Sequence, residues 1–308
     1  MGNVFRVGLI VPTLNAGGLW RTWLGAFAKQ DFKPDYLLVI DSSSADDTAK
    51  LAREAGFRVH VINRKEFNHG GTRQLAVNML PDADILVFAT QDAVFADASS
   101  LRNLLACFAD ESVYASYGRQ LPHVGAGAIG AHARLFNYAP ESRLQDLPSA
   151  RQLGVKTAFI SNSFAAYRRD RLLEVGGFPT NTIMNEDTYV AAKMIFAGGK
   201  IAYCANARVY HSHDYTWTQE FKRYFDIGVF HAREPWLREK LGGVGGEGLR
   251  YVTSESKYLA RQEPLLIPSA LIRTGLKAAG YKLGTLESML PVSWKRRISM
   301  HSSYWRDV

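Results

Sequence analysis

The chain has 308 residues, of which 47% are hydrophobic and 21% are charged. This composition is typical of one or two globular domains and excludes a mainly disordered protein. The net charge is +8, and residues 249–308 hold ten Lys/Arg against four Asp/Glu, so the C-terminal part is the basic part. A basic surface can bind nucleic acid, an anionic membrane or a phosphate-bearing substrate, and composition does not choose between them.

The sequence predicts a protein of the reducing cytoplasm. It contains no run of about 18 apolar residues, and its first residues lack the charged lead and the cleavage pattern of an export signal. The two cysteines, Cys107 and Cys204, show no CxxC or Cys/His spacing. Neither a disulfide nor a structural zinc site is therefore expected.

The first third of the chain contains four short apolar segments that are predicted strands. Helix-compatible stretches separate them, which indicates βαβ units and a largely parallel sheet. Leu19, Trp23 and Phe27 predict the first helix, and Ser44 with Asp47 gives a capping-box pattern for the second. The four segments are Phe5 to Val11, Tyr36 to Ile40, Arg58 to Ile62 and Ile85 to Ala89.

The pattern becomes mixed after about residue 110. Residues 159–167 and 201–209 are predicted strands, and residues 188–197 are a predicted helix. We therefore expect a second half that is built onto the same sheet. From residue 221 onward, aromatic and basic residues interleave through helix-compatible stretches.

Carboxylates follow two of the predicted strands, where open parallel sheets bind their ligands. Asp41 precedes three serines; it can accept a hydrogen bond from a nucleobase or ribose, or the serines can simply cap a helix. Asp92 follows a strongly apolar strand, where it can bind a divalent cation or be an ordinary turn residue.

Two further pairs carry possible chemistry. His211 and His213 follow a predicted strand, and their spacing directs both imidazoles to one face, although surface histidines often have no function. Glu186 and Asp187 precede a predicted helix, whose first turn favours ionised carboxylates; one of them can also be a general base.

The segment around Gly70 and Gly71 permits close approach of the backbone to a ligand. Arg73 is predicted to stand at a helix start, where it can contact phosphate.

Together these segments resemble the family 2 glycosyltransferases with the GT-A fold, and specifically their bacterial rhamnosyltransferase branch. The resemblance runs from about residue 6 to residue 235. DSSSADDT and the ED pair are general family signals, whereas FNHGGTR, TQDA and GRQLP mark the branch. The matching segments are VPTLNAGG, IDSSSADDT, EFNHGGTRQ, TQDAVF, YGRQLPH, SNSFAAYRR, GGFP, NEDTYVAAK and VYHSHDYT.

The resemblance implies an α/β fold with a mixed sheet flanked by helices and a helical C-terminal extension. It places a glycosyltransferase domain at residues 1–235, with a nucleotide-binding half to about 110 and an acceptor half beyond it, and a basic helical region at 236–308. The implied reaction is inverting transfer of L-rhamnose from dTDP-β-L-rhamnose to a lipid-linked O-antigen, lipopolysaccharide or other surface glycan. GDP-D-rhamnose or a hexose donor is one alternative, and an inactive glycan- or nucleotide-binding protein is another.

The resemblance also implies a role for each matching residue. Asp187 matches the general base, and Glu186 would orient it or bind the acceptor. Asp92 and His211 match ligands of Mg²⁺ or Mn²⁺, although Thr90 replaces the first carboxylate of the usual DxD motif. Donor contacts are expected from Thr13, Asn15, Asp41, Ser43, Arg73 and Gln91, and sugar or acceptor contacts from His69, Arg119, Asn162 and His213.

One predicted helical face in the basic region can either pack in the core or contact a membrane. Core packing is the more common outcome for such a stripe. Because acceptors of the resembled family are often lipid-linked, peripheral contact with the inner membrane leaflet is the second hypothesis. No nucleic-acid partner is expected, since the region lacks a docking motif. The face contains Leu271, Ile272, Leu276, Ala279 and Leu283, flanked by Arg273, Lys277 and Lys282.

Overall fold

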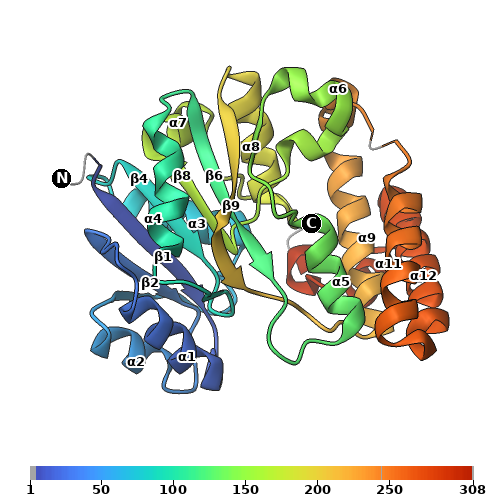
Figure 1. The fold of residues 1–308 in the computed structure, drawn as a ribbon, viewed down its shortest axis with the longest axis horizontal. Helices are drawn as coiled ribbons and strands as arrows, with labels where there is room; N and C mark the ends of the chain where they lie inside the picture. Colours follow the sequence, from blue (N-terminus) through green and yellow to red (C-terminus); the bar gives the residue numbers. More distant parts are fainter. Residues whose placement is uncertain (1–4, 244, 307–308) are drawn as a thin grey trace.

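The computed structural model describes residues 5–243 and 245–306, and Figure 1 shows a twisted sheet with helices on both faces and a group of C-terminal helices at one side. The described chain has one nine-stranded sheet in the order β3-β2-β1-β4-β8-β6-β9-β5, with β7 paired to β9. The strands are β1 (Val7–Thr13), β2 (Tyr36–Asp41), β3 (Arg58–Val61), β4 (Ile85–Ala89), β5 (Val94–Phe95), β6 (Val113–Leu121), β7 (Arg143–Gln145), β8 (Phe164–Arg168) and β9 (Lys200–Tyr210).

Helices separate most of the consecutive strands as far as β9, and after β9 the described chain contains helices and no further strand. The α-helices are α1 (Gly17–Ala28), α2 (Thr48–Glu54), α3 (His69–Met79), α4 (Ser100–Leu105), α5 (Ala128–Asn137), α6 (Ala150–Leu153), α7 (Arg169–Glu174), α8 (Glu186–Phe196), α9 (Trp217–Arg233), α10 (Trp236–Leu241), α11 (Glu247–Gln262), α12 (Ile267–Thr285) and α13 (Val292–Ile298).

The sheet is mixed. Strands β3, β2, β1 and β4 are parallel, as the first four apolar segments predict, whereas β8 runs antiparallel to both β4 and β6. Alternate residues of β1 enter two separate cores because both faces of the sheet are covered. One core lies under α1, α2 and α4, and the other lies under α3, α8 and α9.

The sequence prediction for α1 was wrong in one position. Trp20, Trp23 and Phe27 form its buried face, whereas Leu19 is 37% exposed. The rings of Trp20 and Trp23 stack with centroids 4.9 Å apart. Residues three and four apart lie on one side of a helix, so Trp20 rather than its neighbour shares the face of Trp23.

The predicted capping box at the second helix is also wrong. Helix α2 begins only at Thr48, and the Asp47 side chain caps nothing. The Ser44 hydroxyl instead donates to Asp41 at 2.6 Å, which removes it from helix capping. In the later predicted strand at 159–167, regular pairing starts at Phe164, and the preceding residues form a loop that reaches α8.

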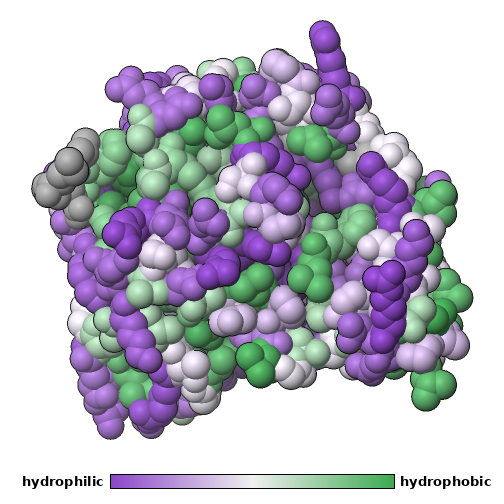
Figure 2. All heavy atoms as spheres, in the orientation of Figure 1, coloured by the Kyte–Doolittle hydropathy of each residue, from purple (hydrophilic) through white to green (hydrophobic). Residues whose placement is uncertain are grey.

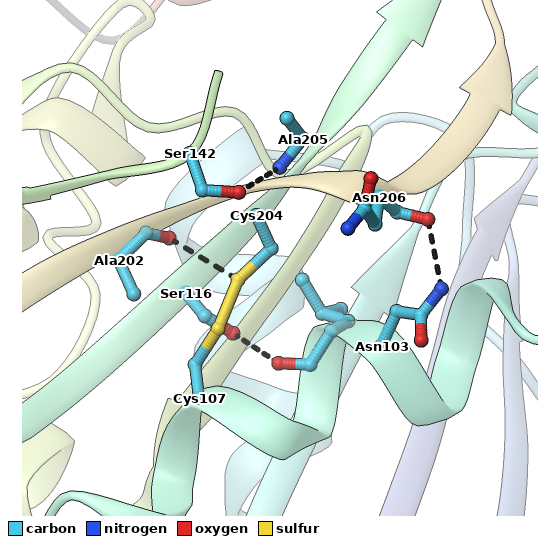
Figure 3. The surroundings of a disulfide bond; sticks show 9 residues. Asn103, Cys107, Ser116, Ser142, Ala202, Cys204, Ala205 and Asn206 are labelled. Carbon is cyan, nitrogen blue, oxygen red and sulfur yellow. Dashed lines mark hydrogen bonds between the residues drawn. A yellow bond between two sulfur atoms is a disulfide. The ribbon is translucent and has the colours of Figure 1, made fainter. Parts of the chain in front are cut away.

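Cys107 and Cys204 form a disulfide, contrary to the expectation from the sequence (Figure 3). Cys107 lies in the turn that follows α4, and Cys204 lies in the middle of β9. Helix α4 packs directly on β9. Two residues 97 positions apart are therefore brought together by tertiary packing, which the spacing of cysteines in the sequence does not reveal.

The C-terminal helices pack tightly through glycines. Helices α9 and α12 approach so closely that a Cβ at Gly228, Gly280 or Gly284 would lie within 2.4 Å of a backbone oxygen on the other helix. Ala270, Gly280 and Gly284 are the buried residues of α12, whereas Leu271 is 52% and Ile272 is 45% exposed. The expectation that the predicted helical face packs in the core is therefore wrong for Leu271 and Ile272. No helix in the described part of the chain is long and apolar enough to span a bilayer.

Gly70 has a positional requirement that affects the candidate site. It lies in the first turn of α3, which Asn68 caps by accepting the N–H of Gly71 at 2.8 Å. A Cβ at Gly70 would lie 1.7 Å from the carbonyl oxygen of Pro179. Only glycine therefore lets α3 approach the segment that leads into α8.

We predict opposite effects for two helical Gly→Ala substitutions. Gly70→Ala forces the α3 backbone away from Pro179, and we expect a loss of roughly 1–3 kcal/mol in the free energy of unfolding, typical of overpacking. Gly25→Ala is the matched control: no atom lies within 4 Å of its new Cβ, so helix propensity should add about 0.5–1 kcal/mol. Urea denaturation of both variants measures this, and equal stabilities would contradict the close approach.

Candidate active site

The ends of β1 and β2 form a buried hydrogen-bonded unit around Asp41. Thr13 and Asp41 are direct partners in the parallel pairing. The Thr13 hydroxyl donates to Asp41 Oδ1 at 2.9 Å, and the backbone N–H of Ser44 donates to Oδ2 at 2.9 Å. Asp41 is 1% exposed, so these donors replace its hydration. A fixed acceptor at this edge suits the N–H groups of a nucleobase.

Three other residues that were predicted to contact the nucleotide-sugar donor lie at the same edge of the sheet, beside Asp41. Asn15 and Ser43 both have left-handed backbones, with φ of 45° and 59°, a strained conformation that often occurs at ligand sites. Asn15 Oδ1 accepts the N–H of Ala45 at 2.7 Å. Gln91 bonds both backbone groups of Leu14, at 2.7 and 3.1 Å. The structure thus brings Thr13, Asn15, Asp41, Ser43 and Gln91 together, with their side chains partly committed to the loops.

Asp92, His211 and His213 form the one cluster of potential metal ligands found among the described residues, with their ligand atoms all within 4.8 Å of one another. Nε2 of His211 lies 3.4 Å and Nε2 of His213 lies 3.8 Å from Asp92 Oδ2. The sequence predicted the first two as ligands. It assigned His213 to the sugar or acceptor, whereas the structure places it beside them.

Gln120 fixes the tautomer of His211. Gln120 Oε1 accepts from Arg134 Nη1 at 2.6 Å, and the same oxygen lies 2.9 Å from His211 Nδ1. Because a guanidinium can only donate, this atom must be the amide oxygen, and Nδ1 must carry the imidazole proton. In neutral His211 the lone pair of Nε2 then points toward Asp92.

Two acceptors this close require a positive charge between them, either a proton on the imidazole or a bound cation. Burial, together with neighbouring His211, lowers the pKa of His213 to about 4. Burial alone would raise the pKa of Asp92, but its hydrogen bonds with His211 and Thr90 hold it below the usual range. A carboxylate and two neutral imidazoles are a suitable ligand set for a divalent transition metal.

Glu186 and Asp187 occupy the first turn of α8, as the sequence predicted, but their environments differ. Glu186 forms an ion pair with Arg73 at 3.1 Å, and each of the two side chains is 6% exposed. Burial alone would raise the pKa of Glu186, yet the Arg73 guanidinium keeps it below the usual range. Burial, followed by repulsion from Glu186, raises the pKa of Asp187 to about 7.

Asn162 connects the two carboxylates. Its backbone N–H donates to Asp187 Oδ2 at 3.1 Å, and its side-chain amide donates to Glu186 Oε1 at 3.0 Å. Tyr167 in turn donates to Asn162 Oδ1 at 2.8 Å, which fixes the amide orientation. A carboxyl group that titrates near neutrality and is held in this way is suited to general base catalysis.

The remaining predicted contacts lie elsewhere. Arg73 is in the second turn of α3 rather than at its start. Its guanidinium bonds the backbone carbonyl of His69 and the carboxylate of Glu186, and not the residues around Asp41. Arg119 donates to the carbonyl of Tyr138 at 3.1 Å. The ring of His69 packs edge-on against His301, with centroids 4.7 Å apart.

Sequence reasoning missed two residues of this region. Gln120 belongs to the GRQLP motif, which was identified as a marker without assigning a role to its glutamine. His301 lies 114 positions beyond Asp187 in a basic segment with no motif, so no signal in the sequence pointed to it.

The chain matches the family model described as glycosyltransferase like family 2 over residues 5–225. It is 50% identical over 304 residues to the O-antigen chain rhamnosyltransferase RfbN of Salmonella typhimurium strain LT2, covering 98% of this chain and 97% of that protein. It is also 50% identical over 301 residues to the O-antigen chain rhamnosyltransferase WbaN of Salmonella anatum, covering 97% and 96%.

The fold is similar to solved glycosyltransferase structures. The mannosyltransferase PcManGT from Pyrobaculum calidifontis, in complex with GDP-Man and Mn²⁺, aligns with a TM-score of 0.59 at 19% identity over 98% of this chain and 85% of that one. Residues 1–349 of TarS from S. aureus align with a TM-score of 0.56 at 15% identity over 92% and 91%. At these identities the likeness concerns the fold alone, and it confirms the predicted GT-A architecture.

We predict that Gln120 controls metal affinity through His211. Gln120→Leu removes the acceptor of the Nδ1–H, and loss of such an outer partner typically weakens metal binding roughly 10–100-fold. Gln120→Glu has nearly the same shape and keeps an acceptor for both His211 and Arg134, so its affinity should remain close to that of the wild type. Titration with Mn²⁺ followed by electron paramagnetic resonance measures both. Equal affinities in two folded variants would contradict the assigned tautomer.

Proposed function

The chain belongs to the family 2 glycosyltransferases, and on that basis we propose that it transfers L-rhamnose from dTDP-β-L-rhamnose to a lipid-linked O-antigen precursor. The observation that carries this proposal is 50% identity, over almost the whole of both chains, to two O-antigen chain rhamnosyltransferases. The site supports it, because a carboxylate with a pKa of about 7 and a cluster of metal ligands lie at one edge of the sheet.

We assign the chemistry to Asp187 as general base. Its carboxylate takes the proton of the acceptor hydroxyl, whose oxygen attacks the anomeric carbon of rhamnose. The bond from that carbon to the diphosphate breaks, dTDP leaves, and the β-linked donor gives an α-linked product. The charged pair of Glu186 and Arg73 keeps a negative charge next to the base, which maintains its proton affinity near neutral pH.

We assign donor binding to the unit around Asp41 and metal binding to the Asp92 cluster. Asp92, His211 and His213 would hold Mg²⁺ or Mn²⁺, which would supply positive charge to neutralise the departing diphosphate. Thr13, Asn15, Ser43 and Gln91 would form the nucleoside side of the pocket. Arg73 was expected to contact the donor, and Arg119 the sugar or the acceptor. Both side chains bond protein groups, so either contact requires the side chain to change its partner. We further propose that residues 1–110 form the nucleotide-binding half, residues 111–235 the acceptor half, and residues 236–308 a basic helical region.

The function is tested by transfer assays with purified protein. The acceptor is lipid-linked glycan extracted from a strain that lacks this enzyme, and the donors are dTDP-L-rhamnose, GDP-D-rhamnose and UDP-glucose with Mg²⁺ or Mn²⁺. We expect metal-dependent transfer from dTDP-L-rhamnose alone. Preference for another donor would contradict the proposed sugar, and absence of transfer from every donor would favour an inactive binding protein.

Asp187→Asn should abolish transfer and keep donor binding. Loss of a general base typically lowers the rate roughly 10²–10⁴-fold. Asp170→Asn is the matched control, because its side chain is 70% exposed on α7. The comparison also separates an enzyme from a binding protein, since only an enzyme loses turnover in this variant while its donor affinity is unchanged.

The pH dependence of the transfer rate should follow the ionisation of Asp187. The base acts when ionised, so a pKa of about 7 predicts a transfer rate that falls about tenfold for each pH unit below neutrality and levels off above it. The rate at saturating donor and metal, measured between pH 5 and pH 9, tests this. A rate that stays constant from pH 9 down to pH 5 would contradict this, because an ordinary carboxylate is ionised throughout that range.

We further propose that the enzyme acts in the cytoplasm at the inner face of the membrane, through the edge formed by α11 and α12. Figure 2 shows hydrophobic side chains projecting at this edge beside charged ones. Leu249 near the start of α11 is 71% exposed, and Leu265, Leu271 and Ile272, at and just before the start of α12, are 93%, 52% and 45% exposed. Arg250, Lys257 and Arg261 are exposed along α11 and would meet anionic headgroups.

Liposome sedimentation tests the membrane contact. Vesicles containing phosphatidylglycerol should retain the protein at low salt and release it at high salt, because each basic residue near an anionic surface contributes about 1 kcal/mol. Combined replacement of Arg250, Lys257 and Arg261 by Gln should weaken retention, whereas vesicles of phosphatidylcholine alone should retain little of either protein. Absence of binding at low salt would contradict the proposal.

A further inference from the structure

The last described segment, residues 299–306, returns from the C-terminal helices to the region of the catalytic carboxylates. In Figure 1 the reddest part of the ribbon lies between the sheet and helices α9 to α12 rather than at the outer edge. Here His301 packs edge-on against His69, with ring centroids 4.7 Å apart. Both residues are partly buried, so neither is fully removed from solvent.

This segment is anchored on both sides of His301. Asp226 of α9 is fully buried, and its Oδ2 accepts the backbone N–H of Met300 at 2.9 Å and of His301 at 3.1 Å. Beyond it, the Tyr304 hydroxyl donates to the carbonyl of Asn181 at 2.9 Å, and Trp305 is 1% exposed in the core. The position of the His301 ring is therefore set by backbone and neighbours rather than by its own hydrogen bonds.

A short chain of contacts links His301 to Glu186. His69 is the first residue of α3, and its carbonyl accepts from Arg73 Nη1 at 2.8 Å. The same nitrogen lies 3.1 Å from Glu186 Oε1. Asn181, which Tyr304 holds, belongs to the segment that leads into α8. The two imidazoles thus lie beside the pair of Arg73 and Glu186.

The two imidazoles are neutral at physiological pH. Burial, with smaller contributions from His69 and Arg223 and against the opposing effect of Glu186, lowers the pKa of His301 to about 3. Burial also lowers the pKa of His69. A neutral imidazole offers one N–H donor and one acceptor, which together match a sugar hydroxyl.

We propose that His301, together with His69, forms one wall of the acceptor site and hydrogen-bonds hydroxyl groups of the acceptor sugar. This inference rests on the proposed function, because it assumes that Asp187 deprotonates an acceptor held beside Glu186. It assigns to the basic C-terminal region a direct role in recognising the glycan, in addition to its structural role.

His301→Ala tests the proposal without removing the anchor, because Asp226 bonds the backbone N–H of residue 301. We expect the KM for the acceptor, the lipid-linked glycan extracted from a strain lacking this enzyme, to rise about tenfold, the effect of losing a hydrogen bond to substrate. The KM for dTDP-L-rhamnose and the rate of donor hydrolysis without acceptor should stay unchanged. His301→Asn keeps a donor and an acceptor and should restore part of the acceptor affinity. His60→Ala, on β3, is the control for loss of a histidine elsewhere.

The outcomes separate this inference from the proposed function. Wild-type transfer of rhamnose with an unchanged acceptor KM in His301→Ala would overturn the inference and leave the function intact. An equal fall in donor hydrolysis and acceptor use, with a lower Tm that His301→Asn shares, would show a purely structural role and overturn it as well. Absence of transfer by the wild type would contradict the proposed function and the inference together.

Discussion

The site depends on the buried ion pair between Arg73 and Glu186. Both side chains are almost fully removed from water, and a buried charge is tolerated only when a partner and further hydrogen bonds compensate its lost hydration. Arg73 provides the compensation from α3 and Asn162 provides it from the loop before β8. The paired Glu186 then places a fixed negative charge beside Asp187, which raises the proton affinity of Asp187. The close approach at Gly70 is what brings α3 near enough for this pair.

The order of the strands explains how distant segments meet around that pair. Strands β4, β8, β6 and β9 are consecutive neighbours in the sheet. Because β8 is antiparallel to β4, the carboxyl end of β4 lies beside the amino end of β8, with Ala89 opposite Phe164. Parallel pairing of β6 with β9 likewise places Gln120 next to the end of β9. Asp92, Asn162, Gln120 and His211 therefore gather at one edge, although more than 100 residues separate the first from the last.

Sequence reasoning succeeded where the signal was local. Apolar runs predicted the first four strands, and the placement of Asp41, Asp92 and His211 at or just after strand ends, and of Asp187 in the first turn of a helix, was also predicted. It failed where the determinant was tertiary. The partner of Arg73, the contact of Gln120 with His211 and the disulfide all depend on which strands pair and which helices pack. Neither periodicity nor spacing encodes those neighbours. The capping box failed for a related reason, since the Ser44 hydroxyl had a better partner in Asp41.

The helical C-terminal region is tied to the carboxylates by a continuous series of contacts. Glycines at the α9 and α12 interface let the two backbones approach closely, which fixes α9 against α12. Helix α9 contributes Asp226, which holds residues 300 and 301, and Arg233, which bonds both Glu287 and the Tyr304 hydroxyl. Tyr304 then reaches Asn181, in the segment before α8. A disturbance at the α9 and α12 interface can therefore reach the start of α8, so the geometry of Glu186 and Asp187 depends on packing within the C-terminal helices.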